Sequence, residues 1–183
     1  MINEMQAFIH KRIAMLDKDD PYSKAARAKL RRAVGKPRNQ TPDIWDITLQ
    51  GAPENNLECD IIHTILTLYA LHRQSKDQSM NDNETNFGAA IAKLITPDKN
   101  NEDAIRRRFN AVATAQEFSE LTHHARGLIQ LLRASDVKMN YVQFAKDLYF
   151  FKNPSTKDSI RLRWGEQFYR TNIKEANDNE TIS

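Results

Sequence analysis

Four amphipathic segments follow one another between residues 102 and 170, and each repeats its apolar side chains at intervals of three or four residues. In the first, Ile105, Phe109 and Val112 fall on one face of a helix with 3.6 residues per turn. The others carry the pattern at Phe118, Leu121, Ala125, Leu128 and Leu132, at Phe144, Leu148 and Phe151, and at Ile160, Trp164 and Phe168. None contains a long apolar run, so each has to bury its stripe against the others. The spacing predicts a four-helix bundle over residues 98–172.

Cap residues predict where these helices begin. Thr114 and Glu117 have the spacing of a capping box, which predicts that the second helix starts at Thr114. Asn140 is a favoured N-cap and predicts the start of the third helix. Ser155 and Asp158 predict the start of the fourth in the same way. Short junctions therefore separate the four helices.

Further helical segments are expected in an N-terminal part, residues 1–97. They lie at residues 3–16, 23–34, 41–50, 57–75 and 87–95. The segment at 57–75 is apolar around most of its circumference, which predicts a central helix with two structural histidines, His63 and His72. Trp45 is expected to anchor the short segment at 41–50 to the core.

No stretch of the sequence alternates as a strand does, and no Asn-Gly or Asp-Gly hairpin turn occurs. We therefore predict an all-α protein, a helical bundle of about eight helices arranged in one or two packed sub-bundles. Pro97 and the polar residues after it mark the expected division between residues 1–97 and 98–172. Residues 173–183 hold one lysine against three acidic residues, and we expect a disordered acidic tail there.

Basic residues are concentrated on two parts of the chain. The segment at 23–34 carries five basic residues and no acidic one, whereas surface helices ordinarily mix both signs. These five are Lys24, Arg27, Lys29, Arg31 and Arg32. On the bundle, the candidates are Arg107, Arg108, Arg126, Arg133 and Arg163. Because the planar guanidinium group suits phosphate, we interpret both sets as candidate nucleic-acid contacts. For the first set there is an alternative: its basic face pairs with the acidic loop at 17–20.

The sequence contains no recognised motif for catalysis or metal binding. There is no phosphate-loop, nucleophile-elbow or paired-histidine metalloprotease motif, and Cys59 is the only cysteine. His123 and His124 are adjacent, so on a helix their side chains diverge by about 100° and do not share a metal ion. The sequence therefore favours a protein that is not an enzyme and needs no cofactor or metal. Without a signal peptide or an apolar run of about 20 residues, we also expect no membrane segment and a cytoplasmic location.

Several sequence blocks together resemble one family. They are residues 28–32 (AKLRR), 86–91 (NFGAAI), 123–133 (HHARGLIQLLR), 144–149 (FAKDLY), 160–164 (IRLRW) and 168–170 (FYR). In this order and spacing they resemble the CasB-type small subunit of the type I-E CRISPR Cascade complex. Ala89 stands where related sequences often have a basic residue, and Asn140 stands in place of a frequent aspartate that would cap a helix equally well.

The resemblance implies an all-helical, non-catalytic subunit of a crRNA-guided antiviral surveillance complex. Implied partners are crRNA, target DNA including the non-target strand, the backbone and large subunits, and a second copy of the chain. Its basic surface would stabilise the guide–target duplex and the displaced strand of the R-loop. Such a role needs charge along a groove rather than a base-reading code. Arginines on several helices, with few exposed aromatic residues, fit contact with the nucleic-acid backbone better than base stacking. The alternatives are a helical adaptor that binds an acidic protein partner, and a nuclease or nucleotide hydrolase.

Overall fold

The chain is all-α. The computed structural model describes the backbone of residues 2–180 and the side chains of residues 2–171. The α-helices are α1 (Ile2–Leu16), α2 (Pro21–Ala33), α3 (Trp45–Thr48), α4 (Asn56–His72), α5 (Phe87–Ala92), α6 (Glu102–Thr114), α7 (Phe118–Ala134), α8 (Tyr141–Phe151) and α9 (Pro154–Glu180). Two 3₁₀ turns, η1 (Arg38–Gln40) and η2 (Pro42–Ile44), lie between α2 and α3. Within residues 2–180 there is no β-strand, which confirms the predicted fold class.

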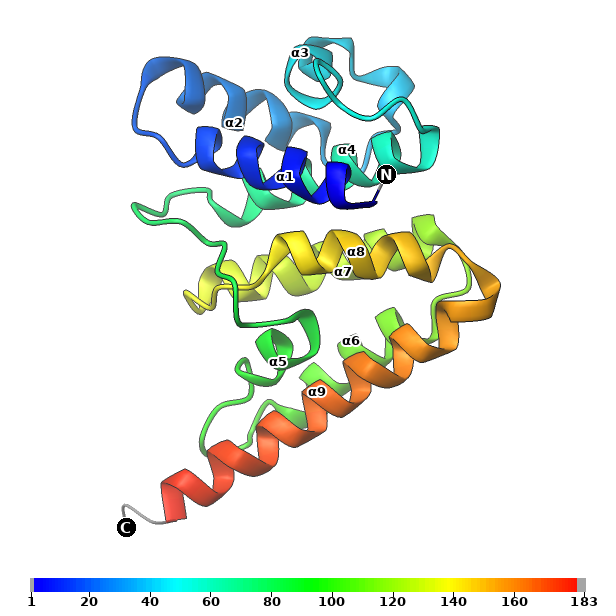
Figure 1. Ribbon diagram of the computed structural model, residues 1–183. Coiled ribbons are helices and arrows are strands. Elements are labelled where there is room, and N and C mark those ends of the chain that lie inside the picture. Colours follow the sequence, from blue (N-terminus) through cyan, green and yellow to red (C-terminus); the bar gives the residue numbers. More distant parts are fainter. Residues whose placement is uncertain (1, 181–183) are drawn as a thin grey trace.

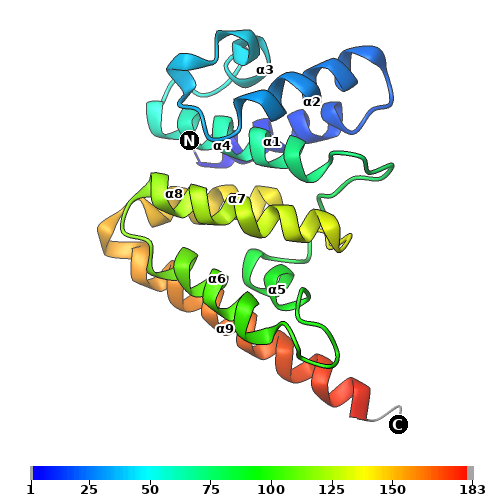
Figure 2. The same cartoon turned by 180° about the vertical axis from the view of Figure 1, so that it is seen from behind.

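The helices lie in three tiers. In Figure 1, α1 to α4 form one end, α7 and α8 lie across the middle, and α5, α6 and α9 form the other end, and Figure 2 shows the same order from behind. Helix α4 contacts α1, α2 and α3 on one side and α7 and α8 on the other. Nearly all of its side chains are buried, so the prediction of a central helix is confirmed. Among the described residues, none of the helices combines the length and the hydropathy that a membrane span requires.

Of the cap residues predicted between residues 102 and 170, Asn140 agrees with the structure, whereas Thr114 and Ser155 do not. Asn140 accepts a hydrogen bond from the backbone N–H of Gln143 and caps α8 as predicted. Thr114 is wrong as a cap, because α6 continues through it and its hydroxyl donates to the Asn110 carbonyl. Ser155 is also wrong, because α9 starts one residue earlier.

Helices α2 and α9 begin earlier than expected because a proline occupies the first helical position of each. In α9, the residue ahead of Pro154 is Asn153, whose side chain accepts from the Ser155 N–H. In α2, Asp20 precedes Pro21 and accepts from the Ser23 N–H at 2.9 Å. Proline fits there because the N–H that it lacks would have no partner within the helix. In both helices the cap is thus the Asn or Asp ahead of the proline rather than a serine.

Trp45 does not anchor its segment to the core. Its side chain is 41% exposed, whereas Ile44 and Ile47 fill the buried positions around it. The indole N–H donates to the Arg38 carbonyl at 2.9 Å, which leaves the ring at the surface. The prediction for this tryptophan is therefore wrong.

Helix α5 and the C-terminal helix α9 bear on the predicted section boundaries at residues 97 and 173. The division at residue 97 stays a prediction, although α5, which precedes it, lies against α9, which follows it (Figure 1). Helix α9 continues to Glu180, so residues 173–180 are helical where we expected a disordered tail. No glycine or proline interrupts these residues, and Lys-Glu-Ala at 174–176 favours a helix. Residues 181–183 lie outside the described residues.

Gly88 allows α5 and α9 to approach closely. A Cβ at this position would lie 2.2 Å from the backbone oxygen of Trp164 and 2.9 Å from Cβ of Gln167. We expect Gly88→Ala to lower the free energy of unfolding by about 3 kcal/mol, the upper part of the range for overpacked cores, because backbone has to move. Denaturant unfolding measures this value. Gly165→Ala in α9 is the matched control: no atom lies within 4 Å of its added Cβ, so the change should stabilise the helix by up to ~1 kcal/mol. Equal effects of the two changes would contradict this account.

His72 makes stability depend on pH. It is fully buried, and Nδ1 lies 2.9 Å from the Tyr141 hydroxyl. Burial lowers its pKa from 6.5 to about 4. Between these two values the unfolded chain binds more protons than the folded chain, so stability falls as the pH is lowered. From pH 7 to pH 5 the free energy of unfolding should fall by about 2 kcal/mol through His72 alone.

Urea unfolding of wild type and His72→Gln at both pH values measures this contribution. The variant should lose less stability on acidification than wild type. The variant keeps the pH-dependent loss of stability that comes from His63, because burial lowers the pKa of that histidine as well. The same pH dependence in both proteins would show that His72 is not the group responsible.

Candidate nucleic-acid interface

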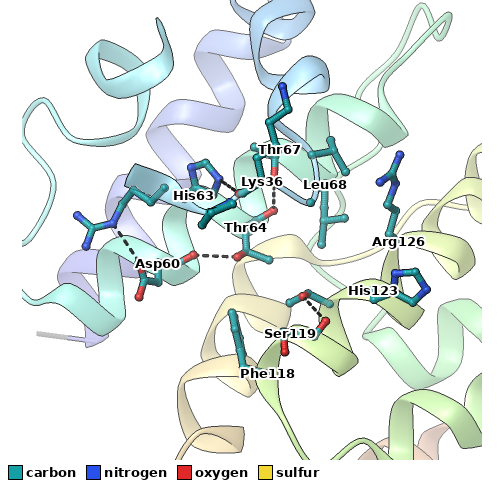
Figure 3. A pocket seen from close by; sticks show the side chains of 15 residues that line it. Lys36, Asp60, His63, Thr64, Thr67, Leu68, Phe118, Ser119, His123 and Arg126 are labelled. Atoms are coloured by element: carbon teal, nitrogen blue, oxygen red, sulfur yellow. Dashed lines mark hydrogen bonds and ion pairs between the residues drawn. The ribbon is translucent and has the colours of Figure 1, made fainter. Parts of the chain in front are cut away.

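A hollow of about 500 Å³ lies between the segment that follows α2, the middle of α4 and the first half of α7 (Figure 3). Its lining includes the basic side chains Lys36, Arg38, His123 and Arg126 and the hydroxyl groups of Thr64, Thr67, Ser119 and Thr122. In the close-up, Arg126 and His123 come from α7, opposite Lys36 and His63. The hydroxyls of Thr64, Thr67 and Thr122 already donate to backbone carbonyls, and Asp60 in the lining pairs with Arg38. The remaining basic side chains around the hollow suit an anionic ligand.

Gly35 brings the end of α2 against α7. Its φ of +79° is a conformation that side chains rarely adopt, and it turns the chain sharply after α2. A Cβ there would lie 3.3 Å from a guanidinium nitrogen of Arg126, so that arginine reaches across to the turn. The turn is also held from α4, because Nε2 of His63 lies 3.0 Å from the Lys36 carbonyl. A carbonyl oxygen only accepts, so Nε2 of His63 carries the proton and donates.

A second hollow of about 270 Å³ continues the first along α7. It is lined from α6 by Arg107, Arg108 and Ala111, and from α7 by His123, His124, Gly127 and Leu128. Because His123 lines both hollows, the basic side chains form one continuous surface. We call Lys36, Arg107, Arg108, His123 and Arg126 the basic surface. None of the five forms an ion pair within the described part of the chain, and all are exposed.

Other predicted site residues have partners inside the molecule. Lys24 pairs with Asp19 at 2.7 Å, and the Arg27 guanidinium donates to the carbonyls of Leu16 and Lys18 at the end of α1. The structure thus places these two side chains against the 17–20 loop, as in the alternative that the sequence left open. They are available to a ligand only if those contacts break.

Arg133 and Arg163 also have internal partners. Arg133 donates to the side-chain oxygen of Gln74 at 2.8 Å. Arg163 pairs with Asp147, which is 1% exposed. Its guanidinium therefore neutralises a buried carboxylate, a structural task that competes with phosphate binding.

Asp147 joins α8 to α9. Its carboxylate accepts from the indole N–H of Trp164 at 2.6 Å and from the side-chain amide of Gln143 at 2.8 Å, besides Arg163. Burial raises the pKa of Asp147, whereas these donors and the guanidinium charge lower it. The group is a polar link within the core.

The three other basic residues predicted on α2 lie outside both hollows. Lys29 and Arg31 are half-buried and Arg32 is exposed, and none forms an ion pair among residues 2–171. Burial lowers the pKa of Arg31, and the neighbouring charges of Arg27 and Arg32 lower it further. A phosphate next to these side chains would relieve their mutual repulsion. Their role as nucleic-acid contacts stays a prediction.

Sequence reasoning left Lys36 and His123 out of the candidate set. Lys36 lies in a turn, where helical periodicity does not tell which way a side chain points. Its signal is the position directly after Gly35, a glycine that ends a basic helix. His123 precedes Arg126 by three residues and therefore shares its helical face. Among the described residues, no group of three or more His, Cys, Asp and Glu side chains is placed to hold a metal ion.

Comparison with solved structures identifies relatives of the same fold. The chain is similar to CasB from Thermobifida fusca, with 27% identity over 90% of this chain and 97% of that chain and a TM-score of 0.78. It is also similar to M. ruber CasB, with 25% identity over 98% of each chain and a TM-score of 0.71. A chain of a CRISPR RNA-guided surveillance complex shares the fold at 21% identity, covering 98% of this chain and 99% of that chain, with a TM-score of 0.79.

A comparison with proteins of curated function gave no match. The family model of CRISPR-associated protein Cse2 (CRISPR_cse2), in contrast, matches residues 26–169, from α2 through most of α9. The match spans both the Gly35 turn and the arginines of α6 and α7. Family model and fold agree with the resemblance noted in the sequence, and the chain belongs to the CRISPR-associated Cse2 family.

Proposed function

We propose that this protein is a non-catalytic subunit of a crRNA-guided antiviral surveillance complex and binds nucleic acid through the basic surface. Family membership supports the assignment to such a complex, as does the shared fold with a chain of a CRISPR RNA-guided surveillance complex. Its partners would be the other subunits, a second copy of itself, crRNA and target DNA. In that setting the protein would stabilise the guide–target duplex and the displaced non-target strand.

The observation that carries the proposal is the arrangement of Arg107, Arg108 and Arg126. They extend from two helices around two hollows that share a histidine, and no acidic side chain of the described residues pairs with them. Guanidinium groups so placed contact phosphates without reading bases. The same surface would therefore accept strands of any sequence.

The proposal is tested by the binding of a labelled single-stranded oligonucleotide to the purified chain at several salt concentrations. If five phosphates are neutralised, log K should fall with log salt at a slope of about −3.5, from ~0.7 per contact. Affinity would then drop about a hundredfold between ~50 and ~200 mM salt. Absence of binding at low salt would favour the adaptor that meets an acidic protein. Cleavage of the oligonucleotide in the presence of magnesium or manganese would contradict a non-catalytic role.

A further inference from the structure

Trp45 presents an aromatic ring at the surface next to the basic surface. It is one of two tryptophans, and it is 41% exposed, whereas Trp164 is fully buried. Trp45 lines a third hollow, of about 490 Å³, together with Pro37, Arg38, Asn39, Leu49 and Asp60. That volume lies within the ~300–1,000 Å³ typical of ligand pockets. An exposed ring in a hollow of this size is suited to stack on a planar group.

The orientation of the indole is fixed in advance. Its N–H donates to the Arg38 carbonyl at 2.9 Å, and the Thr41 hydroxyl donates to the same oxygen at 3.0 Å. The Arg38 guanidinium is held in turn by Asp60 at 3.0 Å and by the Asn56 side chain at 3.2 Å. A ring that is already ordered loses little conformational entropy when a partner stacks on it.

The hollow at Trp45 is continuous with the basic surface. Pro37, Arg38 and Asp60 line both this hollow and the larger one that contains Lys36, His123 and Arg126. In Figure 3, Asp60 and Arg126 lie on opposite sides of the larger hollow, so the hollow at Trp45 adjoins the side away from Arg126. A strand whose phosphates lie along the basic surface thus has a base-sized opening beside its path.

We propose that Trp45 is a stacking platform for one base of a single-stranded nucleic acid bound to the basic surface. This inference rests on the proposed function and adds a base contact to the phosphate contacts. Every base has a π-face, so stacking keeps binding tolerant of sequence. The positive charge of the adjoining basic surface favours a nucleic acid over an apolar peptide as the occupant of this hollow.

The test measures the affinity of wild type, Trp45→Phe and Trp45→Leu for an oligothymidine strand by anisotropy of a labelled strand. Leucine keeps an apolar side chain but has no ring, so Trp45→Leu should bind about tenfold more weakly, or ~1.4 kcal/mol. Phenylalanine keeps a ring and should fall between the two. Melting temperatures control for folding. Equal affinity of all three proteins would overturn the inference.

An abasic strand of the same length separates base contacts from phosphate contacts. Wild type should bind it about tenfold more weakly than oligothymidine, whereas Trp45→Leu should bind the two strands equally. Equal, salt-dependent binding of both strands by wild type would overturn the stacking site and leave the proposed function standing. If neither strand binds, both proposals fail.

Tryptophan fluorescence gives an independent readout. Stacking of a base on Trp45 should quench the exposed indole, while buried Trp164 supplies a constant background. Quenching by oligothymidine but not by the abasic strand is the expected result. If Trp45→Leu leaves DNA affinity unchanged but weakens assembly with another subunit of the complex, the hollow binds protein and the inference is wrong.

Discussion

Replacing Asp147 by alanine is expected to lower the free energy of unfolding by about 3 kcal/mol. The change removes the acceptor of the indole N–H of Trp164, a fully buried side chain, and a buried donor without a partner costs ~1–3 kcal/mol. It also removes the partners of Gln143 and Arg163. Because Arg163 is 41% exposed, its charge regains water and adds less than a fully buried charge would. Thermal unfolding should shift by about 10 °C.

Asp158→Ala is the matched control on the same pair of helices. Asp158 pairs with Arg161 at 3.0 Å, but its side chain is 90% exposed, so the loss should be at most ~1 kcal/mol. Asp147→Asn preserves the shape and an acceptor for Trp164, and it should fall between wild type and the alanine variant. Similar stability losses for the two alanine variants would show that Asp147 is not the structural link described above.

The fold could be predicted because its main signal is local. In α9, Ile160, Trp164 and Phe168 recur every four residues, and all three are buried in the core. Helix starts were less well predicted, since several capping residues compete within one turn. The start of α7 shows this: Thr114 has the right type and spacing, yet α6 includes it. The choice depends on how far the preceding helix continues, which is a property of the packed molecule.

Short elements carry too little periodicity to identify their buried face. Helix α3 has four residues, so the sequence does not separate the surface position of Trp45 from the buried position of Ile47. Tryptophan was assigned to the core because of its size. In the structure its N–H meets the Arg38 carbonyl, a contact across the preceding turns that a helical pattern does not contain.

The site could be predicted only in part, because it depends on which helices meet. Periodicity correctly places Arg107 and Arg126 on exposed faces, but it does not show that α6 and α7 bring them to adjacent hollows. It also does not show that Arg163 meets Asp147, or that Arg27 meets the end of α1. Unpaired arginines are therefore distinguished from paired ones by the tertiary structure alone.

Arg126→Glu is expected to produce the largest loss of nucleic-acid binding. Arg126 lines the hollow of about 500 Å³, reaches the Gly35 turn and has no ion-pair partner within the described residues. Reversing the charge of this side chain removes one phosphate contact and adds a negative charge that repels phosphate at the centre of the basic surface. Affinity for single-stranded DNA at low salt should fall at least tenfold, equally for two unrelated sequences, because phosphate contacts carry no sequence information. The melting temperature should stay close to wild type, since the side chain is exposed.

Arg170→Glu is the control with the same change in net charge. Arg170 is 75% exposed, pairs with Glu166 on α9 and lines neither hollow of the basic surface. Its reversal should leave affinity within about twofold of wild type, the small effect expected of a charge away from the strand. Equal losses in the two variants would indicate attraction by overall charge rather than contact at a site.

The salt dependence of binding by wild type, Arg126→Glu and Arg170→Glu is the most direct measurement of the central claim that the basic surface contacts phosphates. From ~0.7 per contact on a single strand, the slope of log K against log salt should be about −3.5 for wild type and for Arg170→Glu. For Arg126→Glu it should be about −2.8, because one contact is lost. Identical slopes and affinities in three stably folded proteins would contradict the claim, and the basic surface would then be only solvated.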